Sequence, residues 1–332
     1  MMKGGKNVIL LLLCAVLFMS SCNDTSDEWD VNTEKAINTF TEINESIIDK
    51  ETFVYFTDPH LLGNGNLFNN AIKSRLASSF VPVGELFEHL PLNFALCGGD
   101  WLIDGDTQEV AAEKLLYADA QMKQLFGGRY YKMMGNHDTN YQGIVSGTDS
   151  SRGDFSRDFI DKTYFSETGS AYYTFDGKCT SFFILDSWLD LTPQMNDYRW
   201  EQLNWLANQL KNNRSQHKVI GIHMYYKEGQ AVPMSELLTD ICDAFNFRQV
   251  IAINGNEYDF SQSAGKIHLI ISGHSHVDGI NYVGNHSDIP VVRTCDFMKG
   301  GDFDLCILDY DSGYLHMIRV GNGENRKVKL AM

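Results

Sequence analysis

The chain has 332 residues and a formal net charge of −16, with 43 acidic side chains against 27 basic ones. This balance argues against a protein that binds duplex nucleic acid, because duplex binding needs a basic surface. The length suffices for one large α/β domain, and beyond residue 50 we find no linker, internal repeat or low-complexity tract.

The first 21 residues are predicted to be a signal peptide and not a part of the fold. Lys3 and Lys6 precede an apolar run from Val8 to Met19 that is too short to span a bilayer comfortably. Ser20-Ser21-Cys22 then resembles a bacterial lipobox, although Met19 stands where that pattern prefers leucine. We therefore expect an exported lipoprotein, acylated on Cys22. An ordinary secretory signal, cleaved near the serines, is the alternative.

Residues 22–50 are polar and acidic, which is typical of a tether. A short periodic piece at residues 36–48 predicts a helix that docks near the end of this tether. Loss of Lys3 and Lys6 with the signal would take the formal charge from −16 to −18. We expect the domain to be held by its lipid at the periplasmic or cell-surface face of a bacterial membrane.

Residues 51–325 are predicted to form one domain that begins with alternating strands and helices. Apolar runs at residues 53–57, 94–97 and 130–134 predict strands. Helical periodicity fills residues 71–90, with an interruption at Pro82, and residues 108–126, with Thr107 as the cap. This order is typical of consecutive βαβ units with parallel strands.

The second half of the domain predicts a mixture of hairpins and helices. Residues 139–168 are rich in Ser, Gly and Asp and predict an inserted loop. A hairpin is expected at 171–185, around Asp176-Gly177, and a helix at 198–210. Further strands are expected at 219–222 and 269–272, and another hairpin at 303–320. The whole order predicts an α/β fold of two packed mixed sheets flanked by helices.

Five polar clusters stand at the ends of predicted strands. They are Asp58-Pro59-His60, Gly98-Gly99-Asp100, Gly135-Asn136-His137-Asp138, the single His223, and Gly273-His274-Ser275-His276. The carboxyl ends of such strands can share one crevice, where open α/β sheets bind ligands. Imidazole, carboxylate and amide groups without a thiolate suit a pair of first-row divalent metals. Each cluster alone is a weak signal, since a single core histidine or an Asx turn would explain it equally well.

The five clusters together resemble the signature of the calcineurin-like metallophosphoesterase superfamily. That signature runs D-x-H, G-D, G-N-H-[DE], H and G-H-x-H, and the resemblance spans residues 53 to about 277. It implies a four-layer αββα sandwich. It also implies that one metal is held by Asp58, His60, Asp100 and His276, and a second by Asp100, Asn136, His223 and His274. His137 matches the catalytic histidine, which is not a ligand.

The sequence departs from the family pattern beside the bridging aspartate. Many members carry an aspartate three residues after it, which orients the catalytic histidine, but here Ile103 occupies that place. The next residue is Asp104, which we predict takes the role from a shifted loop. Asp138 is the alternative, and it is also open that neither residue does so.

The resemblance implies hydrolysis of phosphate esters by in-line attack of a hydroxide that bridges two divalent metals, either Mn, Fe or Zn. His137 would protonate the leaving oxygen or stabilise its charge. A phosphodiesterase acting on a phosphorylated small molecule or lipid fits best. A phosphomonoesterase or a nucleotide pyrophosphatase would use the same ligands.

A function of another class is a surface-anchored binding protein with a vestigial metal site, although no ligand of the pattern is lost. Substrate choice would depend on the loops between the clusters. Trp101, Tyr141, Tyr225 and Tyr226 follow closely on site residues and either stack on the substrate or pack in the core.

Overall fold

The structure is a computed structural model that describes residues 29–61, 68–103, 106–140, 155–186, 196–227, 230–231, 233–285 and 288–332. The predicted signal peptide with Cys22, the candidate Asp104 and the aromatic Tyr141 lie outside these residues. Within the described ranges, no helix is both long enough and apolar enough to cross a membrane.

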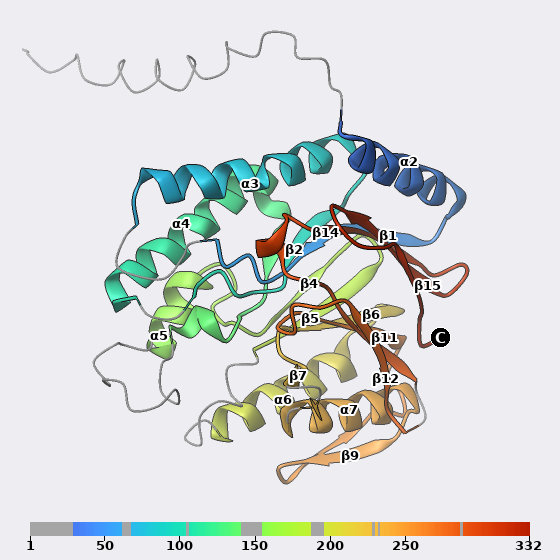
Figure 1. The fold of residues 1–332 in the computed structure, drawn as a ribbon. Helices are drawn as coiled ribbons and strands as arrows, with labels where there is room; N and C mark the ends of the chain where they lie inside the picture. The colour runs from blue at the N-terminus through green and yellow to red at the C-terminus, as the bar shows by residue number, and fades with distance from the viewer. Residues whose placement is uncertain are drawn as a thin grey trace, which may run out of the picture.

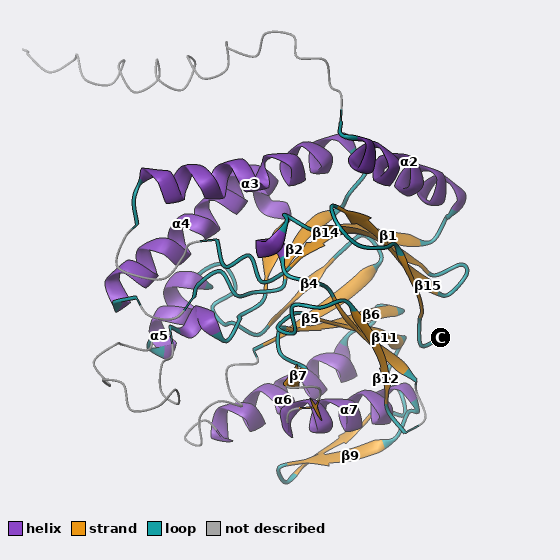
Figure 2. Ribbon diagram, viewed as in Figure 1, coloured by secondary structure: helices purple, strands orange, loops and turns teal. Residues whose placement is uncertain are grey.

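Two six-stranded mixed sheets pack face to face, with helices on both outer surfaces (Figures 1 and 2). This arrangement confirms the predicted αββα sandwich. The first sheet has the order β16-β15-β14-β1-β2-β3, formed by Arg326–Lys329, Tyr314–Val320, Phe303–Asp309, Lys50–Phe56, Phe94–Cys97 and Tyr130–Lys132. The second has the order β12-β13-β11-β6-β5-β4, formed by Gly279–Val283, Ile289–Arg293, Lys266–Ser272, His217–Ile222, Thr180–Leu185 and Tyr173–Asp176.

The helices divide between the two outer faces. The first sheet is covered by α2 (Val31–Ser46), α3 (Asn70–His89) and α4 (Gln108–Phe126). The second sheet is covered by α6 (Asn196–Asn212) and α7 (Pro233–Asn246). Outside α6 and α7 lies a hairpin that the sequence did not predict, formed by β9 (Val250–Ile253) and β10 (Asn256–Asp259).

Parallel pairing places the ends of the central strands at one edge of the sandwich. β1 pairs in parallel with β2, and β2 pairs in parallel with β3. In the second sheet β5, β6, β11 and β13 are parallel neighbours. Loops that follow these strands therefore emerge together, as the βαβ pattern of the sequence predicts.

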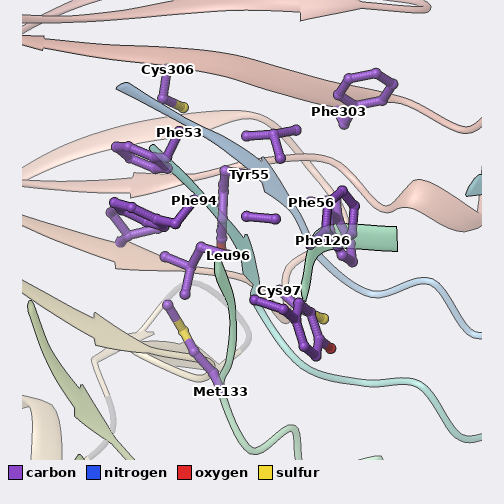
Figure 3. Close-up of a cluster of buried hydrophobic side chains, with 14 of the residues drawn as sticks. Phe53, Tyr55, Phe56, Phe94, Leu96, Cys97, Phe126, Met133, Phe303 and Cys306 are labelled. Atoms are coloured by element: carbon purple, nitrogen blue, oxygen red, sulfur yellow. The ribbon is translucent and has the colours of Figure 1, made fainter. Parts of the chain in front are cut away.

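Strand β1 is buried on both faces. Successive side chains of a strand point to opposite sides, so one set meets the second sheet and the other meets the helices. Figure 3 shows the cluster around it. Phe53 stacks on Phe94 with ring centroids 5.0 Å apart and meets Phe182 of the second sheet edge-on at 5.9 Å. On the helix side, Phe56 contacts Phe80 of α3 at 5.0 Å. This packing holds the strand that carries the first polar cluster between two apolar layers.

Two expectations about helices were wrong. α3 continues through Pro82 without a break, because its buried stripe of Leu76, Phe80 and Val83 packs on both sides of the proline. The segment 139–168, expected as a polar loop, is helical in part of its described portion, at α5 (Arg157–Phe159) and η3 (Ile160–Tyr164).

The region predicted as a tether, residues 22–50, contains helix α2. Asp30 caps this helix, and Thr33, Ala36 and Phe40 are buried. The helix contacts strands β15 and β14. Residues 31–46 are therefore a packed part of the outer layer, because α2 has an apolar stripe to bury.

Candidate metal centre

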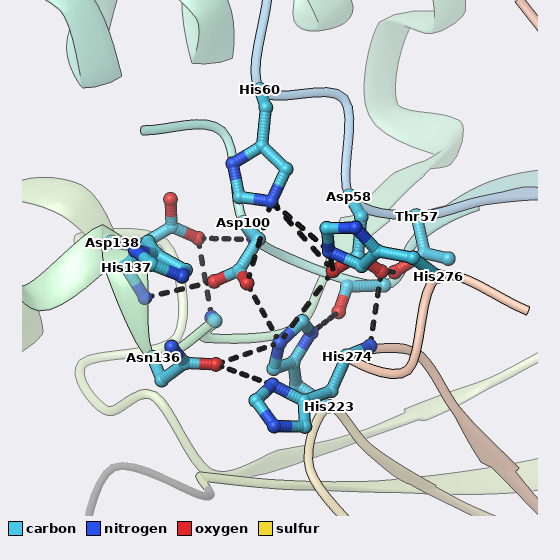
Figure 4. A network of polar contacts seen from close by, with 12 residues as sticks. Thr57, Asp58, His60, Asp100, Asn136, His137, Asp138, His223, His274 and His276 are labelled. Carbon is cyan, nitrogen blue, oxygen red and sulfur yellow. Dashed lines mark hydrogen bonds and ion pairs between the residues drawn. The ribbon is translucent and has the colours of Figure 1, made fainter. Parts of the chain in front are cut away.

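The seven residues predicted as metal ligands lie together at the carboxyl edge of the two sheets (Figure 4). The loops after β1, β2 and β3 carry four of them, and the loops after β6 and β11 carry the other three. Three overlapping groups of potential ligand atoms each fall within 4.8 Å. They are Asp58, His60 and His276; His60, Asp100 and His137; and Asp100, His223 and His274.

The backbone at this edge is strained. Among the described residues, nine that are not glycine have positive φ, and five of these are predicted ligands: Asp58 (52°), His60 (39°), Asp100 (62°), His274 (67°) and His276 (55°). Left-handed conformations of residues with a Cβ cost free energy and persist where the surroundings enforce them. Such strain, concentrated on candidate ligands, is typical of a functional site.

The first group converges on one point. The Nδ1 atom of His60 lies 2.6 Å from the carbonyl oxygen of Leu102, so it donates a hydrogen bond and leaves Nε2 as the inward-facing lone pair. That Nε2 lies 3.4 Å from Nε2 of His276, which in turn lies 3.1 Å from Oδ1 of Asp58. Two imidazole nitrogens and a carboxylate oxygen thus face each other.

The second group is built in the same way. Nδ1 of His223 donates to the carbonyl oxygen of Gly98 at 2.6 Å, and its Nε2 lies 3.0 Å from Oδ2 of Asp100. The side-chain oxygen of Asn136 lies 3.2 Å from that Nε2 and 2.8 Å from Nδ1 of His274. Asparagine oxygen and imidazole nitrogen therefore meet beside the same carboxylate.

Asp100 lies between the two groups. Its Oδ2 faces His223 at 3.0 Å and His60 at 3.8 Å, while its Oδ1 accepts the backbone N–H of His137 at 2.9 Å. The carboxylate thus contacts one imidazole from each group, and this position suits a residue that bridges two cations.

The residues present fit a pair of divalent cations. Oδ1 of Asp58 and Oδ2 of Asp100 are buried and accept no hydrogen bond from any described residue. Buried carboxylate oxygens are normally satisfied, and a cation bound by the surrounding nitrogens and oxygens would satisfy both. The donor set, nitrogen and oxygen without sulfur, is that of first-row divalent metals.

The pKa values of the imidazoles depend on their burial and on the neighbouring charged side chains. Burial alone would lower the pKa of His223, but Asp100 and Asp58 outweigh it and raise this pKa to about 10. Burial, with the charge of His223, lowers the pKa of His274 to about 4. The two carboxylates thus favour the charged form of His223, whereas burial favours the neutral form of His274.

His137, the predicted catalytic histidine, lies beside the two groups. Its ring meets the ring of His60 edge-on, with centroids 5.2 Å apart. The hydrogen bond from its backbone to Asp100 fixes the start of the short helix η2 (His137–Thr139) next to the bridging carboxylate. Asp104, the residue predicted to orient it, lies outside the described residues.

Asp138, the alternative orienting residue, has a backbone role that the sequence did not reveal. Its Oδ2 accepts the N–H groups of Asp100 and Gly135, at 2.9 and 3.2 Å, and its Oδ1 accepts those of Trp101 and Leu102. Burial, together with the Asp100 carboxylate, raises its pKa to about 6. Asp138 therefore ties the loop after β3 to the loop that carries Asp100.

Asp296 is a further site residue that the sequence did not indicate. Its buried carboxylate lies 3.2 Å from Nδ1 of His276, on the side away from the other ligands. The next residue, Phe297, donates its backbone N–H to the carbonyl oxygen of Thr57, which precedes Asp58. The one signal in the sequence that could have indicated Asp296 is its place three residues after the apolar run at Ile289–Arg293.

Three of the four aromatic residues near the motifs can be assigned. Trp101 is fully buried and packs edge-on against Phe56, so it belongs to the core. Tyr225 is also buried, with its hydroxyl against Thr239. Tyr226 is half-buried and lies under the guanidinium of Arg293, 5.2 Å from the ring centroid.

The sandwich fold and the clustered candidate ligands are those expected of a metal-dependent phosphoesterase. Residues 52–278 match the model of the calcineurin-like phosphoesterase family, and the chain belongs to this family. It is therefore a hydrolase acting on phosphoester bonds, in a family that binds two divalent metals. No curated protein sequence matches the chain.

Solved structures resemble the chain at low sequence identity. A dimetal phosphatase from Danio rerio is 13% identical, with a TM-score of 0.56 over 84% of this chain and 98% of its own. The NAD nucleotidase of Haemophilus influenzae is 14% identical, with a TM-score of 0.40 over 85% of this chain and 50% of its own. The first likeness supports the sandwich fold, and the second is too distant to add to it.

Proposed function

We propose that the protein is a metal-dependent phosphodiesterase that acts on a phosphorylated small molecule or lipid. The observation that carries this proposal is the pair of buried, unpartnered carboxylate oxygens on Asp58 and Asp100, which face imidazole nitrogens. Among the described residues, no lysine or arginine forms an ion pair with either carboxylate. The choice of a diester follows the likeness of the five polar clusters to the family signature.

Each residue then has a role in holding the cations, which we expect to be Mn, Fe or Zn. Asp58, His60, Asp100 and His276 would hold the first, and Asp100, Asn136, His223 and His274 the second. Such a pair supplies Lewis acidity to the phosphoryl oxygens and lowers the pKa of a bound water. His137, beside the bridging carboxylate, would give a proton to the leaving oxygen.

We also propose that Cys22 is acylated and holds the enzyme at the periplasmic or cell-surface face of a bacterial membrane. The lipobox-like sequence supports this, and helix α2 begins at Val31, nine residues after that cysteine. Labelled palmitate should enter the wild type and not a Cys22→Ser variant when both are expressed in bacteria. Equal labelling of both would contradict the anchor.

The function is tested with two chromogenic esters, bis-p-nitrophenyl phosphate and p-nitrophenyl phosphate, on the chain loaded with Mn²⁺, Zn²⁺ or Fe²⁺. We expect a higher kcat/KM for the diester. Asp100→Asn should lose bound metal and hydrolysis together, whereas Asp259→Asn, an exposed carboxylate on the β9–β10 hairpin, should keep both. Faster cleavage of the monoester would indicate a phosphomonoesterase, and cleavage of neither ester would contradict the proposal.

The role of His137 is tested in the same assay. His137→Ala should lower kcat by about 10²- to 10⁴-fold, because proton transfer to the leaving group is lost. Metal content, measured on the same samples by elemental analysis, should stay at the wild-type level. Wild-type turnover in this variant would remove His137 from the mechanism.

A further inference from the structure

We propose that Arg293 and Tyr226 form a subsite for a second anionic group on the substrate. The inference rests on the proposed phosphodiester hydrolysis and names its substrate class. The substrate would be a diester that carries a further phosphate or carboxylate on one of its two esterified groups.

Arg293 is a half-buried cation, and the contacts of its side chain with the described residues are all neutral. One Nη donates to the side-chain oxygen of Asn281 at 2.8 Å, and the other lies 3.4 Å from Oγ of Ser275. The guanidinium lies over the ring of Tyr226, and its Nε is buried with no hydrogen-bond partner among the described residues. A guanidinium has five N–H donors, and most of those of Arg293 have no acceptor in the part of the chain that the structure describes.

Other arginines near this edge of the sheets are neutralised by aspartates. Arg319 pairs with Asp304 at 2.9 Å, and Arg326 pairs with the same carboxylate at 2.6 Å. Arg157 lies 2.6 Å from Asp186, which follows β5. In a chain of net charge −16, the absence of a described carboxylate at Arg293 leaves a positive charge that an anionic ligand can meet.

The position of Arg293 connects it to the metal centre. It is the last residue of β13 and pairs in register with Ser272, the last residue of β11. Its contact Ser275 lies between the ligands His274 and His276. Its other contact, Tyr226, follows the ligand His223 by three residues. The guanidinium therefore touches both ligand-bearing loops of the second sheet.

The chain leaves room for this orientation at Gly279. A Cβ atom at that position would lie 2.4 Å from an Nη atom of Arg293. Any larger residue would push the guanidinium away from its present place across the strand. The glycine thus leaves space for the cation beside Ser275 and over Tyr226.

The chemistry of this pair selects an oxyanion. A planar guanidinium binds phosphate or carboxylate through two parallel N–H donors. The ring of Tyr226 stabilises the cation from one face and limits its movement. An ester bound at the metals and long enough to pass Ser275 would bring such a group to Arg293.

The test compares three diesters that share the p-nitrophenyl leaving group and differ at the para position of the second ring. They are p-nitrophenyl phenyl phosphate, its 4-carboxyphenyl analogue and its 4-phosphonophenyl analogue, assayed on the Mn²⁺-loaded full chain. We expect the wild type to show a kcat/KM about 10- to 100-fold higher for at least one of the two anionic esters, as for a charge-assisted hydrogen-bonded pair. The carboxylate and phosphonate arms distinguish the two kinds of anion.

Variants then assign the preference to the subsite. Arg293→Gln should remove the preference for the anionic ester, and Arg293→Lys should keep part of it. Arg248→Gln is the matched control, because Arg248 is also half-buried and unpaired with a carboxylate but donates to the carbonyl oxygens of Phe245 and Gly265. The preference of Arg248→Gln for the anionic ester should equal that of the wild type. A wild type without preference, or an equal loss on all three esters in Arg293→Gln, would overturn the subsite.

A binding measurement separates this proposal from the function on which it rests. Calorimetry with phenylphosphonate, 4-carboxyphenylphosphonate and 1,4-phenylenebisphosphonate reports affinity without turnover. The ligand that carries the anion preferred in the ester assay should bind the wild type at least about tenfold more tightly than Arg293→Gln, and phenylphosphonate should bind both proteins about equally. A chain that cleaves no ester would contradict the phosphodiesterase, whereas equal affinities in both proteins would contradict the subsite.

Discussion

At the scale of single residues, most candidate imidazole ligands already have a partner at Nδ1, the ring nitrogen that faces away from the other ligands. His60 and His223 each face a main-chain carbonyl oxygen through Nδ1, at 2.6 Å in both cases. His276 instead faces the buried carboxylate of Asp296. These outer bonds fix the tautomer and direct Nε2 inward, and a carboxylate in this place also makes the imidazole a stronger ligand.

Asp296 is therefore expected to act as a positioning residue for His276. Asp296→Asn should weaken the affinity for Mn²⁺ or Zn²⁺ by about 10- to 100-fold, as for other outer partners of metal-bound histidines. Metal titration against a chelator of known affinity measures this without turnover. Asp302→Asn is the control, because that nearby carboxylate accepts the N–H of Asn322 and contacts no ligand. An affinity equal to the wild type in Asp296→Asn would contradict the role.

At the scale of elements, the strand that carries Asp58 depends on segments far from it in sequence. β1 pairs with β14, in a register that sets Phe53 opposite Cys306, and β14 pairs with β15. Helix α2, from the other end of the chain, packs on β14 and β15. Both terminal segments thus support the first sheet, although the family model ends at residue 278.

The packing of α2 predicts a large effect for its buried aromatic residue. Phe40→Ala should lower the free energy of unfolding by about 3 kcal/mol, because it leaves a cavity beneath the helix. Ile48→Ala is the matched control, since the side chain of Ile48 is 90% exposed, and it should change stability by less than about 0.5 kcal/mol. Urea unfolding measures both. Equal stabilities of the two variants would show that α2 is not part of the cooperative fold.

At the scale of the whole molecule, a second group of histidines links the residue before β1 to the C-terminal segment. His268 of β11 lies with Nε2 3.0 Å from Nδ1 of His217 and with Nδ1 2.5 Å from the carbonyl oxygen of Ala331. His217 lies 3.3 Å from Asp49, which precedes β1. This group stands at the start of β6 and β11, at the end of these strands away from the metal centre.

We expect the buried His268 to lower the free energy of unfolding in acid. Burial lowers its pKa to about 4 in the folded chain, against 6.5 for an ordinary imidazole. As the pH falls from 6.5 to 4, the unfolded chain gains a proton that the folded chain does not, so stability decreases across that window by up to about 3 kcal/mol. His268→Asn keeps a donor to Ala331 and should show a shallower decrease in urea unfolding at stepped pH. Identical pH profiles would contradict this.

Much of the fold follows from local patterns in the sequence. The first three strands, the cap at Thr107 and the hairpin at Asp176-Gly177 are found where periodicity and turn residues predict them. Pro82 misled because the proline is a local signal for a break, whereas the helix is held by residues that pack against distant elements. The helical portion of the segment 139–168 was missed for the same reason, since Phe155, Ile160 and Tyr164 are buried among polar sequence neighbours.

The sequence by itself determined the family, the layer order and the set of candidate ligands, because each ligand stands at the end of a strand that short apolar runs reveal. Only the tertiary structure decided how those ligands are supported. Asp138 bonds to backbone that lies 36 to 38 residues before it, and Asp296 and Arg293 reach the ligand loops from a strand that the sequence did not predict. Such partners are chosen by proximity in the folded sandwich, which no local pattern encodes.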